Sequence, residues 1–178
     1  HMIKLRCLLV ALPLLAHSPA RADEPVDTVR VLIEMAAHNS ADPVDGKYVQ
    51  QEYFSANMLL RFFSEDFTKT FATALLKTNE RRHELMIDWD PIIGGQDNCP
   101  LENIVYGPTK KKNAKFEITV AFKAKACFGA DSGASDVSKV TFTLKKEELV
   151  PGSPLYLIDD IAHPGEPSLK TTLHEIAK

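Results

Sequence analysis

The spacing of hydrophobic residues changes once along this chain, and that change constrains the fold more than any other feature. Over residues 25–78 the hydrophobic residues recur every three or four positions, which predicts helices at 25–39, near 55–61 and near 64–78. Hydrophobic and polar residues then alternate, which predicts strands at 101–106, 115–126, 137–146 and 154–162. Helices followed by a strand meander are typical of an α+β fold, with helices packed on one face of an antiparallel four-stranded sheet.

Residues suited to capping lie at the starts of two predicted helices. The stretch SEDF begins at Ser64, which is a good helix cap, and a short last helix begins after Ser168. Phe63, Phe67 and Phe71 lie three or four residues apart, so we interpret them as core residues rather than as an aromatic binding stripe.

Residues 1–22 have the composition of a leader segment. His1 and Met2 are typical of residues left by cloning, and Lys4 and Arg6 precede an apolar run at 7–16. Ala20-Arg21-Ala22 then matches a signal-peptidase site. The apolar run is shorter than the ~20 residues of a membrane-spanning helix. We therefore expect a periplasmic protein without a stable membrane anchor after cleavage, in which residues 23–178 form a single α+β domain.

The charge of this mature chain is acidic. Three of the 21 basic residues lie in the leader, so 18 basic residues remain against 24 acidic ones, a net charge of −6. Such a balance argues against nucleic acid as a partner, because binding to phosphates requires clustered lysine and arginine. Lys110 to Lys112 form a basic cluster, which we interpret as a solvated loop tip.

Two cysteines, Cys99 and Cys127, remain after cleavage of the leader. An even pair in an oxidising compartment predicts a disulfide, which the chain-entropy model expects to stabilise the fold by restricting the unfolded chain. A metal site would need more ligands than this pair, and the sequence has no CxxC or HxxxH spacing. We therefore expect no bound metal and no cofactor.

The segment DWDPIIGGQD at residues 88–97 is the strongest candidate for a site. Its aspartates could bind a cation together with Asp159 or Asp160, although the segment does not match a calcium-binding loop. One aspartate could instead act as a general base among apolar neighbours. The composition also suits a structural junction near a cleft, because a residue before proline avoids helical angles and the glycine pair permits a turn. We favour the junction.

The expected function follows from this interpretation. No GxSxG, SxxK, HExxH or P-loop motif occurs, and His163 before Pro-Gly is interpreted as a solvated turn residue. We predict no catalytic residue and a non-enzymatic binding or interaction protein, whose partner is another protein or a small apolar ligand. An immunity or inhibitor protein and a small isomerase or dehydratase with an aspartate base are the alternatives. The expected ligand-binding residues are Tyr53, Asp90, Gln96, Asp97 and Asp159.

Several short motifs resemble those of an exported bacterial family, the domain of unknown function 3828. They are Asp90-Pro91, Gln96-Asp97, the stretch at 157–161 and the helix at 168–176. The resemblance covers roughly residues 27–177. It implies a cystatin-like cone of the nuclear transport factor 2 superfamily, in which a curved sheet wraps a long helix and leaves a pocket at its open end. The Gly94-Gly95 pair and the two cysteines are departures from that pattern.

Overall fold

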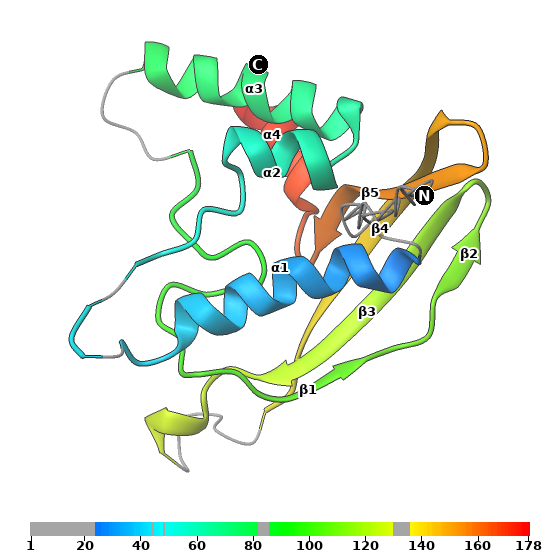
Figure 1. Ribbon diagram of the computed structural model, residues 1–178. Coiled ribbons are helices and arrows are strands. Elements are labelled where there is room, and N and C mark those ends of the chain that lie inside the picture. The colour runs from blue at the N-terminus through cyan, green and yellow to red at the C-terminus, as the bar shows by residue number, and fades with distance from the viewer. Residues whose placement is uncertain (1–23, 44, 48, 82–85, 130–135) are drawn as a thin grey trace, which may run out of the picture.

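The computed structural model describes residues 24–43, 45–47, 49–81, 86–129 and 136–178. The predicted signal peptide at 1–22 and most of the predicted loop at 129–136 lie outside these residues. The described part is an α+β structure with four α-helices and a curved antiparallel sheet of five strands (Figure 1). The predicted fold class is therefore confirmed at this level.

The helices begin where the sequence supplies caps. They are α1 (Pro25–Ser40), α2 (Ala56–Phe62), α3 (Glu65–Glu80) and α4 (Leu169–Ile176). The hydroxyls of Ser64 and Ser168 accept hydrogen bonds from backbone N–H groups in the first turns of α3 and α4. Both predicted caps are confirmed, and all four helices lie close to their predicted positions.

The sheet has one strand more than the sequence predicted. Its strands are β1 (Glu102–Tyr106), β2 (Lys110–Lys112), β3 (Lys115–Lys123), β4 (Ser138–Val150) and β5 (Ser153–Ala162). The main path runs β1-β3-β4-β5, and β2 pairs with β3. The added strand is the triple-lysine segment, for which the sequence predicts a loop tip. It is solvent-exposed as expected, but its backbone pairs with residues 115–117.

The helices cover the sheet in two places. Helix α1 lies against the face of the sheet, in contact with β3 and β5, whereas α2, α3 and α4 gather beside β5 (Figure 1). The core lies between these layers. Phe63, Phe67 and Phe71 are buried as predicted. One face of β3 and β4 is buried as well, formed by Ile118, Val120, Phe122, Val140, Phe142 and Leu144. Among the described residues, no helix is both long and apolar enough to cross a bilayer.

Candidate functional site

The segment at 88–97 folds into a turn closed by its own hydrogen bonds. One carboxylate oxygen of Asp90, Oδ1, accepts hydrogen bonds from the backbone N–H groups of Ile92 and Ile93, at 2.8 and 2.9 Å. The backbone of Asp90 also pairs with Gly94 and Gly95, at 2.8 and 2.9 Å. Gly94 has φ of 86°, a conformation that a residue with a side chain rarely adopts. Asp90 therefore organises the turn, as expected of a structural junction.

Buried side chains hold this turn against the rest of the molecule. Pro91, Ile92 and Ile93 are buried, and Ile92 and Ile93 belong to the hydrophobic core. The second carboxylate oxygen of Asp90, Oδ2, accepts a hydrogen bond of 2.8 Å from the hydroxyl of buried Tyr53, which lies 37 residues earlier in the chain. The turn is thus fixed both to the core and to the segment that precedes α2.

His163 connects the same turn to the sheet. Its ring nitrogen Nε2 lies 3.1 Å from the carbonyl oxygen of Pro91, and Nδ1 lies 3.2 Å from the carbonyl oxygen of Lys139. A β-carbon added to Gly94 would lie 2.9 Å from the imidazole ring, so glycine is required at this close approach. His163 is half-buried, which corrects its interpretation as a solvated turn residue.

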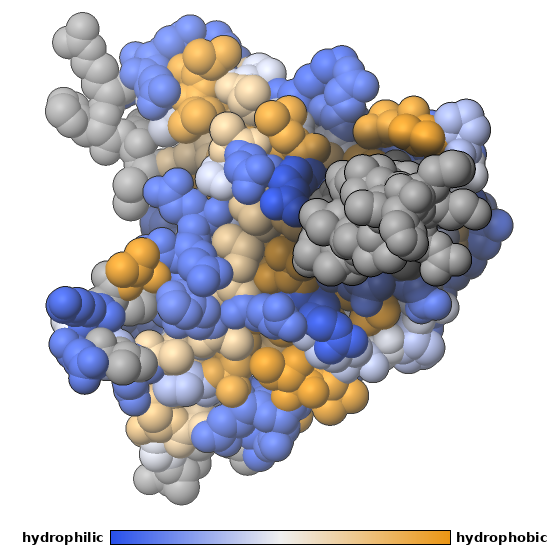
Figure 2. Space-filling view, viewed as in Figure 1, coloured by the Kyte–Doolittle hydropathy of each residue, from blue (hydrophilic) through white to orange (hydrophobic). Residues whose placement is uncertain are grey.

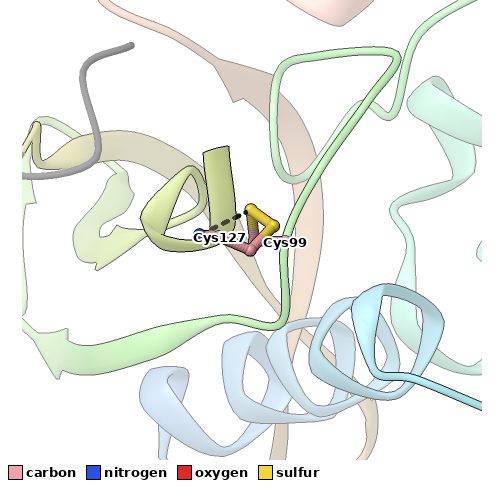
Figure 3. The surroundings of a disulfide bond; sticks show 2 residues. All are labelled: Cys99 and Cys127. Carbon is pink, nitrogen blue, oxygen red and sulfur yellow. Dashed lines mark hydrogen bonds between the residues drawn. A yellow bond between two sulfur atoms is a disulfide. The ribbon is translucent and has the colours of Figure 1, made fainter. Parts of the chain in front are cut away.

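A disulfide fastens the chain immediately after the turn. Cys99 and Cys127 are bonded, as predicted, and join the segment before β1 to a short 3-10 turn, η1 (Ala126–Phe128), that follows β3 (Figure 3). The backbone N–H of Cys99 also donates a 2.9 Å hydrogen bond to the carbonyl oxygen of Ala124. The C-terminal end of the turn is therefore held in place.

An open cleft of about 600 Å³ lies beside the turn. One wall is the turn, and the other consists of the C-terminal end of α1 and the segment before α2. Aromatic rings and polar groups line it: Asn39, Ser40, Gln50, Tyr53, Phe54, Ile87, Asp88, Trp89, Asp90, Pro91, Ile93, Gly95, Gln96 and Asn98. None of these lining residues is a lysine, arginine or histidine. We call this cavity the Asp90 cleft.

The structure brings together three of the five residues expected to bind a ligand. Tyr53, Asp90 and Gln96 line the Asp90 cleft. Asp97 is exposed on the same segment but faces a different hollow, near Lys125 and Ser138. Asp159 is buried, and it lines none of the cavities described here. In the segment before α2, Tyr53 was expected from the sequence, but Gln50 and Phe54 were not, because a loop without periodicity gives no signal of what it faces.

Asp159 is instead the centre of an ion network, which we call the Asp159 junction. Thr143 pairs with Asp160 and Leu144 with Ile158, so Asp159 is the extra residue of a β-bulge in β5. Its Oδ1 accepts a 2.7 Å hydrogen bond from the hydroxyl of Ser64, the cap of α3.

Three lysines complete the Asp159 junction. Lys115 lies 2.9 Å from Oδ2 of Asp159, and Lys145 and Lys170 lie 3.0 and 3.1 Å from Oδ1. Lys170 also pairs with Asp66 at the start of α3. The junction therefore joins β3, β4, β5, α3 and α4 through one buried carboxylate.

The surroundings of Asp159 determine its protonation. Burial alone would raise the pKa of its carboxyl group, but hydrogen bonds from Lys115, Ser64, Lys145 and Lys170 outweigh that effect and hold the pKa well below its usual range. Burial acts to lower the pKa of Lys170, but its bonds to Asp66 and Asp159 raise it overall. Asp159 therefore remains a carboxylate that is neutralised within the protein.

Its neighbour Asp160 has a separate role. The Oδ1 atom of Asp160 accepts a 3.0 Å hydrogen bond from the backbone N–H of Lys170, in the first turn of α4. The two adjacent aspartates of the late stretch thus hold the starts of two different helices. Among the described residues, no group of three metal-ligating side chains gathers at one point.

Comparison with known proteins identifies no relative. No protein-family model, no curated protein and no solved structure matches this chain. Function must therefore be inferred from the geometry of the site.

Proposed function

We propose that this protein is an exported, non-enzymatic binding protein of the bacterial periplasm that holds a small ligand in the Asp90 cleft. The observation that carries the proposal is the cleft itself. Its volume of about 600 Å³ lies within the range of small-molecule sites, and it has both aromatic and polar walls. A wall held by a disulfide, by core residues and by Tyr53 costs little entropy to order when a ligand binds.

The bonding of Asp90 favours binding over catalysis. Both oxygens of its carboxylate already accept hydrogen bonds, two at Oδ1 and one at Oδ2. A general base needs an oxygen within hydrogen-bond reach of the proton that it removes. Oδ1 is committed to the turn and Oδ2 already accepts from Tyr53, so an isomerase or dehydratase that used Asp90 is less well supported.

The exposed hydrophobic side chains favour a small ligand over an extended protein interface. On the face shown in Figure 2, outside the part covered by grey atoms, orange groups are separated by blue ones rather than joined into one broad patch. A broad exposed apolar patch often marks a protein interface, and this face shows none. An immunity or inhibitor role therefore gains no support from this face.

The proposed fold family is compatible with this function. The sheet curves around α1 (Figure 1), which supports the resemblance to the cone-shaped cystatin-like folds stated above. Membership of the domain of unknown function 3828 would add a pocket at the open end of the cone. The Asp90 cleft, beside the C-terminal end of α1, is our candidate for that pocket.

Native mass spectrometry of the protein purified from the periplasm tests the proposed function. We expect a small-molecule mass to be retained by the wild type and lost from Gln50→Trp, because Gln50 lies at the exposed rim and a larger side chain there would fill the cleft. Gln51→Trp is the matched control, since Gln51 is exposed and does not line the cleft. Equal retention in both variants, or no retained mass in the wild type, would contradict the proposal.

A further inference from the structure

The aromatic walls of the Asp90 cleft limit the chemistry of its ligand. Tyr53, Phe54 and Trp89 all line the cavity. The ring of Phe54 packs against Phe63, Phe67 and Phe71, with ring centroids 5.5, 5.9 and 4.9 Å apart. This packing holds it at the cavity wall. Aromatic faces attract cations as well as apolar groups, and tryptophan attracts them most strongly.

The charges that line the cleft also favour a cationic ligand. Asp88 and Asp90 are the charged residues that line it, and within the described residues neither makes an ion pair. Asp90 accepts hydrogen bonds from neutral donors alone, and Asp88 accepts a long one of 3.4 Å from the side-chain amide of Gln96. Neutral donors solvate a carboxylate but do not cancel its charge, so the lining formed by the described residues has a net negative charge.

The same features argue against a bare metal ion. Oδ1 of Asp90 is engaged by the turn and Oδ2 by the hydroxyl of Tyr53, and among the described residues no third carboxylate lines the cavity. A hard cation such as calcium takes six to eight oxygen ligands. A volume of about 600 Å³ is also far larger than one ion requires. A cation that brings its own carbon groups matches the aromatic walls better.

We infer that the ligand of the Asp90 cleft is an organic cation, a primary or quaternary ammonium group attached to carbon. Asp88 is its counter-ion at the open side of the cleft, and Trp89 supplies the aromatic face. Asp90 contributes negative charge while it holds the turn. This inference rests on the proposed function, and it replaces the small apolar ligand expected from the sequence with a charged one.

The chain provides its own reporter for the test. Trp89 is the single tryptophan of the sequence and lies in the wall of the cleft, so its fluorescence reports directly on occupancy. The full chain is titrated with choline and with spermidine as the cationic probes, and with maltose and citrate as neutral and anionic probes. We expect saturable binding of at least one cation, confirmed by calorimetry, and none of maltose or citrate.

Two substitutions separate local recognition from general attraction. Asp88→Asn should weaken binding of the cation at least tenfold. Asp97→Asn removes the same charge from the same exposed segment, but outside the cleft, and should leave affinity unchanged within twofold. Equal weakening in both variants would show that the acidic surface alone attracts the cation, and would overturn the inference.

The remaining outcomes distinguish this inference from the proposed function. Saturable binding of maltose or citrate in place of the cations would overturn the organic cation and leave the binding function standing. Failure of both cations to bind would also overturn it. If native mass spectrometry in addition retained no small molecule, the binding function would fail as well.

Discussion

The Asp90 cleft and the Asp159 junction use the same chemical group for opposite purposes. Asp159 is fully buried and surrounded by three lysines and a serine hydroxyl, so its charge is neutralised inside the protein. Asp88 and Asp90 lie at an open cavity and have only neutral donors.

This difference has an energetic consequence. A buried carboxylate must find its counter-charges within the fold, because the cost of removing it from water is otherwise several kcal/mol. A carboxylate at an open cleft can remain unpaired because solvent still reaches it, and it can then attract a cation from outside. Pairing within the protein therefore marks the Asp159 junction as structural, whereas the Asp90 cleft is where we propose that a ligand binds.

The largest effect is expected for Asp159→Ala. The substitution leaves three ammonium groups close together around a cavity, so we expect a loss of about 4 kcal/mol in the free energy of unfolding, measured by urea denaturation. Glu65→Ala is the control, because its ion pair with Lys69 is exposed on both sides and screened by solvent, so its loss should change the free energy of unfolding far less. Similar losses for the two variants would contradict a buried structural role for Asp159.

The disulfide should have the next largest effect. Replacing Cys99 and Cys127 with serine opens a loop that spans 28 residues, for which the chain-entropy model predicts a loss of about 3.5 kcal/mol. Because the bond fastens the wall of the cleft, affinity for the ligand should also fall, whereas the acid sensitivity of the Asp159 junction should persist. Treatment of the wild type with dithiothreitol should reproduce the loss, and an unchanged unfolding midpoint would contradict the prediction.

Acid should reduce the contribution of the Asp159 junction to the free energy of unfolding. The pKa of Asp159 is lower in the folded protein than in the unfolded chain, where an aspartate has a value near 3.9. Its contribution is therefore fully present above that value and is lost as the pH falls from about 4 towards the folded pKa. The gap in unfolding free energy between the wild type and Asp159→Asn should be constant from pH 5 to 7 and should shrink below pH 4. A gap that widens in acid would contradict the assignment.

Much of the fold was predictable because local signals agree with one another. The three- and four-residue spacing before residue 80, the serine caps and the alternation in β3 and β4 each depend on neighbours in sequence. The disulfide was predictable because two of the three cysteines lie outside the predicted leader and allow one pairing. Strand β2 was missed because three lysines carry no alternation, and its pairing with β3 is visible only in the folded backbone.

The site was predictable only in part, for a related reason. The contacts of Asp90 with Ile92 and Ile93 are local, and the composition of the turn indicated them. By contrast, Asp159 accepts a hydrogen bond from Ser64, which lies 95 residues away in the sequence. His163 contacts the carbonyl oxygen of Pro91, which lies 72 residues away in the sequence. Neither has a signature in sequence, because the bulge in β5 and the close approach at Gly94 create these contacts.

The smallest effects on stability are expected for substitutions of the two aspartates that line the cleft. Asp90→Ala removes the acceptor for two backbone N–H groups and for the hydroxyl of Tyr53, so we expect a loss of about 1.5 kcal/mol in the free energy of unfolding. Asp88→Ala removes an exposed side chain with one long hydrogen bond and should change stability by less than about 0.5 kcal/mol.

Urea denaturation of both variants, together with calorimetric titration of choline, separates the two roles. Asp88→Ala should lose affinity without losing stability, because its charge faces the ligand and holds no turn. If Asp88→Ala destabilised the protein as much as Asp90→Ala, its carboxylate would belong to the junction that holds the turn, and the cleft would lack the unpaired charge that distinguishes it from Asp159.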